Sequence, residues 1–118
     1  MKKYQLTIIT ENQKQPEKAT KLAKIICDTL NWGHNFHITK YDKFEHSYKI
    51  EITENISKTD NWVLEAIDLT DKICNGWIVF FDREQNDIEL ICSNDRILQY
   101  RNVNFNVIRW ARFITQTV

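Results

Sequence analysis

The sequence predicts an α+β domain in which helices pack on one face of a mainly antiparallel sheet. Three observations lead to this fold class. Segments that alternate apolar and polar residues, as strands do, are interspersed with two segments of helical periodicity. The 118 residues suffice for one domain and are too few for two ordinary ones. Two glycines and one proline leave little material for a linker, so we expect residues 1–118 to form a single domain.

The first half of the chain predicts the order β-α-β-β. Residues 4–10 alternate as a strand with one buried face. Pro16 suits the first turn of a helix, and apolar residues then recur every three or four positions, which predicts a helix over residues 16–30. Residues 36–41 and 48–53 alternate on either side of a polar turn, and we expect them to pair as a hairpin.

The second half completes the order β-α-β-β-α-β-β-α. Residues 57–60 resemble the caps of a helix, and the spacing that follows predicts a helix over residues 58–74. The apolar run at 77–81 predicts a central strand, and residues 88–92 form a second hairpin with it. In the tail, residues 103–107 alternate like a strand, but we expect a C-terminal helix from about residue 104 because of a helical apolar stripe. This stripe consists of Val107, Trp110, Ala111, Ile114 and Val118.

Hydropathy and cysteine usage favour a cytoplasmic protein. No stretch approaches the roughly 20 apolar residues that cross a bilayer, so we expect no membrane partner. The first residues alternate too early for the apolar region of a signal peptide. Cys27, Cys74 and Cys92 are odd in number and widely spaced, and each lies in an apolar stretch, which predicts buried free thiols.

The sequence contains no motif that predicts an enzyme, a metal site or a cofactor. Two glycines exclude a glycine-rich phosphate loop. The spacing of His34 and His37 is compatible with zinc ligation from a turn, but it matches no closed zinc site, and we interpret both, with His46, as solvated surface residues. A small His-dependent nuclease that also uses Lys40 or Lys49 stays as an alternative, because phosphodiester cleavage needs two proton carriers and a cation.

The net charge of zero conceals a strong polarity along the chain. Residues 1–50 contain nine lysines and five acids, residues 51–100 four basic and eleven acidic residues, and residues 101–118 three arginines and no acid. We expect the acids of the second helix and the second hairpin to lie adjacent and to form a surface that attracts a basic partner. The predicted partner-binding acids are Glu65, Asp68, Asp71, Asp82, Glu84, Asp87 and Glu89, with Trp62 as an apolar anchor.

Two other interpretations of the charges stay open. The acids have a plainer role in keeping the protein in solution. The predicted first helix carries Lys18, Lys21 and Lys24 on its outward face, and these lysines together with Trp32 and Phe36 are suited to a small nucleic-acid-binding regulator. A near-neutral isoelectric point of about 6.8 and the acidic second half argue against nucleic acid.

The chain resembles bacterial immunity proteins, the antidotes of contact-dependent inhibition and other polymorphic toxin systems. The resemblance lies in a short α+β layout rich in Lys, Ile and Asn, an acidic second half, the missing catalytic motif and the aromatic segment Val107-Ile108-Arg109-Trp110-Ala111-Arg112-Phe113. It implies a cytoplasmic, non-enzymatic inhibitor that binds one toxin domain, often a nuclease, and blocks its active site or substrate path. No functional residue transfers with it.

These observations favour a protein-binding inhibitor that neutralises a basic toxin domain through an acidic surface, without cofactor or metal. Nucleic acid is the less favoured partner. Helix faces that stay apolar after packing are equally suited to a homodimer, so the sequence leaves the oligomeric state open.

Overall fold

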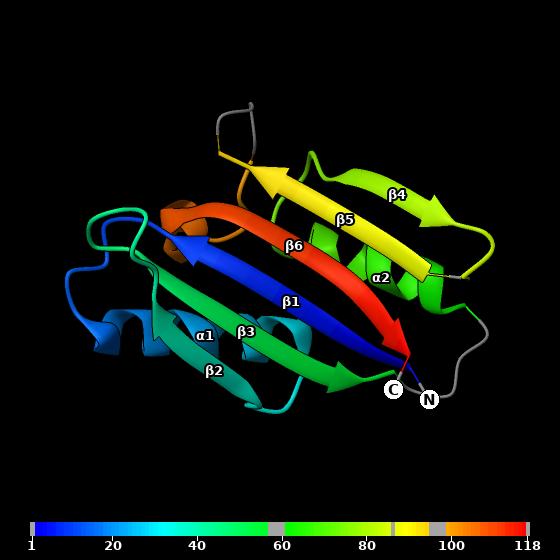
Figure 1. Cartoon of the computed structure of the whole chain (residues 1–118), viewed down its shortest axis with the longest axis horizontal. Coiled ribbons are helices and arrows are strands. Elements are labelled where there is room, and N and C mark those ends of the chain that lie inside the picture. The colour runs from blue at the N-terminus through cyan, green and yellow to red at the C-terminus, as the bar shows by residue number, and fades with distance from the viewer. Residues whose placement is uncertain (1, 57–60, 86, 95–98, 118) are drawn as a thin grey trace.

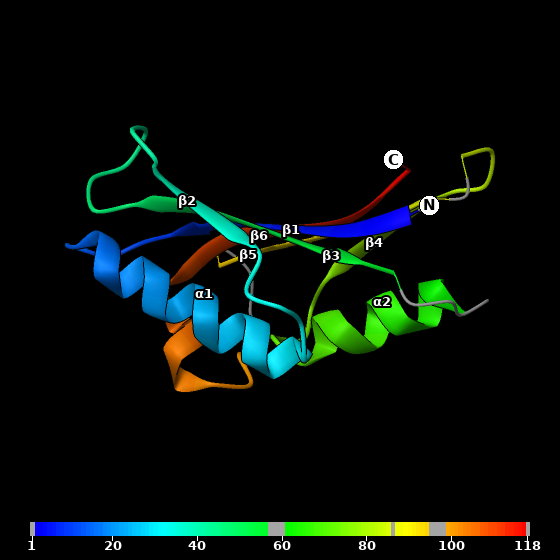
Figure 2. The same cartoon turned by 90° about the horizontal axis from the view of Figure 1, so that it is seen from below.

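A computed structural model describes residues 2–56, 61–85, 87–94 and 99–117. Its described elements are a six-stranded antiparallel sheet and two α-helices, which confirms the predicted α+β class. Both helices lie on the same face of the sheet, and the opposite face carries no described helix (Figures 1 and 2). The strand order across the sheet is β2-β3-β1-β6-β5-β4.

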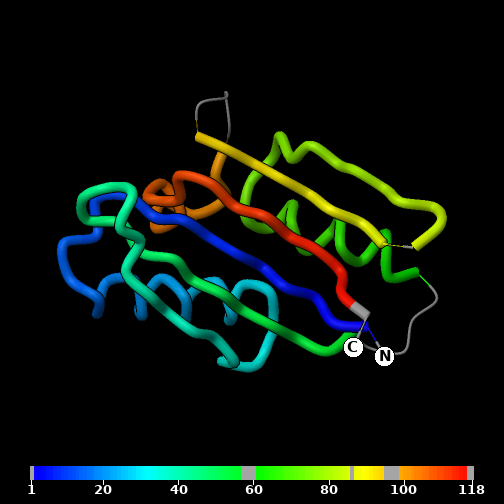
Figure 3. Tube along the Cα trace, in the orientation of Figure 1, coloured from blue at the N-terminus to red at the C-terminus, as the bar shows by residue number. Residues whose placement is uncertain are grey.

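The centre of the sheet is formed by the first and the last strand of the chain. Strand β1 (Lys2–Thr10) pairs antiparallel with β3 (Tyr48–Asn55) on one side and with β6 (Ile108–Thr117) on the other. Strand β2 (Phe36–Lys40) lies outside β3, while β5 (Asp87–Ser93) and β4 (Ile78–Asp82) lie outside β6. The blue and red strands at the middle of Figure 3 show this pairing.

The first helix forms where the sequence predicts it. Helix α1 (Pro16–Leu30) begins with proline in its first turn and ends at Asn31, whose left-handed φ of 57° stops it. Its apolar side chains are buried under the β2-β3-β1 half of the sheet, and the three lysines of the predicted basic stripe are exposed. Helix α2 (Trp62–Asp71) lies under the other half, and its predicted start at residue 58 falls outside the described residues.

The core consists of alternate strand residues packed against the two helices. In the two central strands, Leu6 and Phe113 lie opposite each other and both are fully buried, as are Ile8 and Ala111. Cys27, Cys74 and Cys92 are buried free thiols, as predicted. None of the described helices is long and apolar enough to cross a membrane.

The predicted C-terminal helix is wrong. Only a short 3-10 turn, Val103–Val107, precedes strand β6. Strand β6 lies between β1 and β5, and neighbouring residues partly cover its open face, which is the face turned away from the helices. A strand that is covered in this way carries apolar residues on both faces. Ala111 and Phe113 point to the core, while Trp110 and Ile114 lie on the open face. Ala111 from one face and Trp110 and Ile114 from the other together imitate a helical stripe.

The position of the strand predicted at residues 77–81 is also corrected. The apolar run predicts a central strand, but β4 is an edge strand, and four of its five residues are exposed large hydrophobic residues. Composition alone does not reveal which strand of a sheet lies at the edge, because the order is set by long-range pairing.

Substitution of neighbouring residues in β6 distinguishes the strand from a helix. Phe113→Ala should lower the free energy of unfolding by about 3–5 kcal/mol, because it opens a cavity in the core. Ile114→Ala should cost about 1 kcal/mol, since this side chain is only partly covered on the open face. Urea unfolding of both variants measures the difference. A larger cost for Ile114→Ala would match the helical stripe and contradict the strand.

Candidate functional site

The structure does not bring the predicted acidic residues together on one surface. Glu65 and Asp68 of α2 lie on the helix side of the sheet. In β5, Ile88 and Leu90 point to the helix side and are buried, so Glu89 between them points to the open face. Asp82 and Glu84 lie at the β4–β5 turn. The expectation of one contiguous acidic surface is therefore corrected to two separate groups.

The acids of the β4–β5 hairpin, which are Asp82, Glu84, Asp87 and Glu89, are largely compensated by contacts within the chain. Asp82 accepts hydrogen bonds from the backbone N–H groups of Glu84 and Gln85, at 3.0 and 3.2 Å. Asp71, at the end of α2, pairs with Arg101 at 2.9 Å. Within the hairpin, two further predicted acids form ion pairs, namely Asp87 with Lys2 at 2.7 Å and Glu89 with Arg112. These pairs reduce the attraction that this side of the molecule exerts on a basic partner.

Trp62, the predicted anchor, is in contact with other parts of its own chain. The ammonium group of Lys2 lies 4.7 Å from the centre of the indole ring, and the ring of Phe81 is 6.5 Å away. The side chain is half-buried against the core. Its position therefore fits a structural role at the start of α2.

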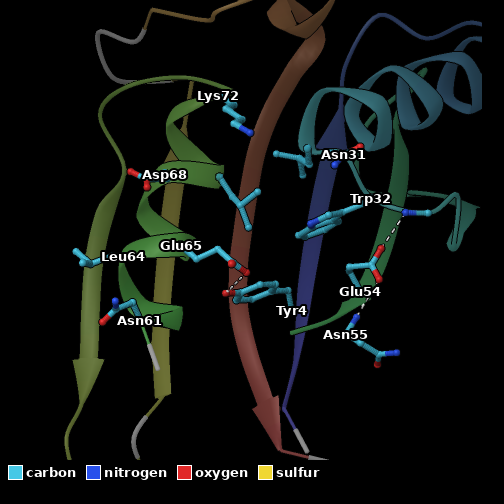
Figure 4. A pocket seen from close by; sticks show the side chains of 13 residues that line it. Tyr4, Asn31, Trp32, Glu54, Asn55, Asn61, Leu64, Glu65, Asp68 and Lys72 are labelled. Atoms are coloured by element: carbon cyan, nitrogen blue, oxygen red, sulfur yellow. Dashed lines mark hydrogen bonds between the residues drawn. The ribbon is translucent and has the colours of Figure 1, made fainter. Parts of the chain in front are cut away.

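A groove between the two helices gathers carboxylates from β3 and α2. It has a volume of about 900 Å³ and is bounded by the end of α1, the loop that follows it, the end of β3 and one face of α2 (Figure 4). Among the described residues that line it, three carry carboxylates, Glu54, Glu65 and Asp68, and one carries an ammonium group, Lys72. Asn31, Asn55 and Asn61 add side-chain amides.

The floor of the groove is aromatic. The ring of Tyr4 on β1 stacks on the indole of Trp32, with ring centres 5.9 Å apart and planes inclined by 7°. Phe113 supports both rings from β6, at 5.1 Å from Tyr4 and 5.9 Å from Trp32. Tyr4 is fully buried, whereas Trp32 is half-buried and lines the groove. The indole therefore offers a partly exposed aromatic surface beside the acids.

A hydrogen bond holds Glu65 over this floor. The hydroxyl of Tyr4 donates to Oε1 of Glu65 at 2.9 Å and lies 3.1 Å from the carbonyl oxygen of Trp62 (Figure 4). Burial raises the pKa of Tyr4 far above its ordinary value, and the hydrogen bond to Glu65 and the charge of that carboxylate raise it further. Tyr4 therefore stays protonated and joins α2 to the central strand.

Glu54 occupies the opposite wall of the groove, next to Tyr4 in the paired strands β3 and β1. Its Oε2 accepts a hydrogen bond from the backbone N–H of Gly33 at 2.8 Å, and its Oε1 accepts one from the N–H of Asn55 at 3.2 Å. These two backbone donors fix the orientation of the carboxylate. The position of Glu54 depends on the strand register, and no local pattern in the sequence predicts it.

The backbone adds to the negative potential of the groove. Asn31 and Lys72, the residues that end α1 and α2, both line it, so two helix C-termini lie at its rim. A helix C-terminus carries a partial negative charge. Neither helix has a basic residue in its last turn. At the end of α2, however, Lys72 is the capping residue and Nε of Arg101 donates to the carbonyl oxygen of Asp71 at 3.0 Å, so the partial charge that is left unbalanced is that of α1. The groove is therefore suited to a cation.

The lining offers groups that bind cations. Among the described residues of the groove there is no histidine, cysteine, serine or threonine that could act as nucleophile or carry a proton at neutral pH. No group of three or more metal-ligating side chains occurs in the part of the chain that the structure describes. A guanidinium or ammonium group, by contrast, finds both carboxylates and an aromatic face here.

The histidines of the alternative nuclease hypothesis are dispersed. His34 contacts Asp28 at 2.8 Å, His46 lies in the β2–β3 turn 3.5 Å from Glu45, and His37 is exposed on edge strand β2. His34 and His46 line separate surface hollows. The described geometry therefore assembles no pair of histidines with a lysine.

Replacement of Tyr4 by phenylalanine tests the hydrogen bond to Glu65. At pH 7 the variant should lose about 1–2 kcal/mol of unfolding free energy. The raised pKa means that wild-type stability falls once pH exceeds the ordinary value of 10.0, where Tyr4 ionises only in the unfolded chain. Urea unfolding should therefore show the gap between the two proteins narrowing by about 1.4 kcal/mol per pH unit above pH 10. A gap that stays constant up to pH 11 would contradict this environment for Tyr4.

Comparison of the chain with protein-family models, with curated proteins and with solved structures finds no match. The site is therefore interpreted from its own geometry.

Proposed function

We propose that this protein is a non-enzymatic binding module that takes a basic side chain of a protein partner into the groove between α1 and α2. The observation that carries the proposal is the combination of three carboxylates with the partly exposed indole of Trp32. A guanidinium group placed there forms charge-assisted hydrogen bonds and lies against an aromatic face at the same time. The C-terminus of α1, which has no basic residue in its last turn, strengthens the attraction.

The sides of the groove support an interface rather than a small-ligand pocket. Leu64 of α2, which is among the residues that line the groove, is 60% exposed and lies near Asp68 and Asn61 (Figure 4). A central charged contact surrounded by amides and an exposed leucine resembles a protein interface with a polar rim. A partner that inserts one arginine or lysine would cover this leucine as it docks.

We further propose that the partner is a toxin domain and that this protein is its immunity protein. The proposal rests on the layout-level resemblance to immunity proteins and on the acidic groove, since a nuclease toxin carries basic residues for its phosphate substrate. A carboxylate-lined groove competes with phosphate for those residues. Binding there would block access of the nucleic acid to the toxin.

The nucleic-acid alternative loses part of its support. Lys18, Lys21 and Lys24 are exposed on α1, but Trp32 stacks on Tyr4 in the acidic groove. The aromatic surface is therefore surrounded by carboxylates that repel phosphate. Retention on heparin near neutral pH would favour the regulator over the protein binder.

The toxin proposal is tested with the protein encoded immediately upstream. Induction of that protein in a bacterial host should stop growth, and co-expression of the present chain should restore it, because the bound groove blocks the toxin. Growth curves with and without the chain measure the effect. Equal killing in both strains, by a toxin shown to be active, would contradict the immunity role.

Charge reversal tests the groove itself. Asp68→Lys should weaken binding to the purified toxin domain about 10-fold or more, on the order of 1.4 kcal/mol, because it places a cation where the partner's cation binds. Glu84→Lys is the matched control, since it makes the same charge change at the β4–β5 turn. Titration calorimetry at two salt concentrations measures both. Equal losses for the two variants would show general charge attraction and contradict a specific groove.

A further inference from the structure

Strand β4 is an edge strand with an unusually apolar surface. It is the last strand in the sheet order, and Ile78, Val79, Phe80 and Phe81 are 41%, 48%, 52% and 48% exposed. Along the outer side of an edge strand, every second residue points its backbone N–H and C=O groups away from the sheet. No described strand pairs with that side.

The other edge of the same sheet is protected. Strand β2 exposes His37, Thr39 and Lys40, and polar or charged residues of this kind discourage pairing with another chain. Strand β4 has no lysine and no proline, and its first charged residue is Asp82 at its end. Within one molecule, one edge therefore carries the features that prevent strand addition and the other lacks them.

The apolar residues of β4 lie on both faces of the sheet. Val79 and Phe81 are paired with Leu90 and Ile88, whose side chains point to the helix side. Ile78 and Phe80 therefore point to the open face. A ligand in a pocket would cover one face only, whereas a strand added to the edge covers both.

We propose that β4 pairs antiparallel with β4 of a second copy of this chain and joins the two sheets into one. Paired residues must have their side chains on the same face of the sheet, so an odd-numbered residue pairs with an odd-numbered one and an even-numbered residue with an even-numbered one. A twofold axis at Val79 places Val79 opposite itself, Ile78 opposite Phe80, and Phe81 opposite Trp77. Asp82 then lies opposite Gly76 and meets neither an apolar side chain nor a like charge.

The exposed area matches what such a dimer needs. Ile67, on the flank of α2 away from the groove, is 40% exposed and adds to the four residues of β4. Five side chains of this size, nearly half exposed, present on the order of 400 Å² of apolar surface. An interface of about 800 Å² per partner that is about 60% apolar requires a little under 500 Å². Half-buried Val63 on the same flank of α2 contributes to the remainder.

The self-association does not depend on the proposed function. The groove is lined from the opposite flank of α2, by Asn61, Leu64, Glu65, Asp68 and Lys72, and no residue of β4 lines it. A twofold dimer through β4 therefore leaves both grooves open. Either proposal can fail while the other holds.

Sedimentation equilibrium of the full chain tests the dimer. The weight-average mass should rise from that of a 14.2 kDa monomer to twice that value with a dissociation constant of about 10 μM or below. Phe80→Lys should keep the chain monomeric over the same concentration range, because it places a charge opposite the apolar side chain of Ile78, next to the twofold axis. Thr39→Lys, a lysine substitution on the other edge, should leave the dimer unchanged. Circular dichroism melts establish that both variants fold.

Three results would overturn the proposal. If the wild-type chain stays monomeric over the whole concentration range, β4 does not pair with a second copy of this chain, and its partner would be a strand of a different protein. A dimer that persists in Phe80→Lys would place the interface elsewhere. Loss of the dimer in Thr39→Lys would assign it to β2.

Discussion

The antiparallel pairing of the first and last strands is the constraint on which the rest of the structure depends. Because β1 and β6 lie side by side at the centre of the sheet, Tyr4 and Phe113 come from opposite ends of the chain and meet under the helices. Together they support Trp32 from the loop after α1, and Tyr4 also holds Glu65 of α2. The floor of the groove and the position of its second helix thus follow from one strand pairing.

The fold places acids that form ion pairs on the β4–β5 hairpin and a second set of acids in the groove between the helices. On the hairpin side, ion pairs to Lys2 and Arg112 compensate Asp87 and Glu89, which stabilises the pairing of distant segments but reduces the negative potential outside. On the helix side, the described residues of the groove include three carboxylates and one lysine, and the C-terminus of α1 reinforces the carboxylates. In the described part of this neutral chain, the groove therefore carries more acidic than basic side chains.

Sequence periodicity was sufficient where local rules decide the structure. Pro16 and the repeat of apolar residues defined α1, and alternation defined β1, β3 and β5. It failed for β6, whose apolar residues lie on both faces of a central strand, and for the edge position of β4, which depends on strand order. Glu65 and Asp68 of the groove were predicted as partner-binding acids, but Tyr4 and Glu54 were missed, because only the register of β1 with β3 brings them together.

The central claim is that the groove binds a cationic side chain, and nuclear magnetic resonance tests it most directly. During titration with an arginine-rich hexapeptide at low ionic strength, the indole N–H of Trp32 and the backbone amide of Gly33, which is bonded to Glu54, should shift in a saturable way. The amides of Glu84 and Gln85 at the β4–β5 turn should stay unchanged, since their acceptor Asp82 lies outside the groove. Shifts concentrated at that turn, with none at Trp32 and Gly33, would contradict the account.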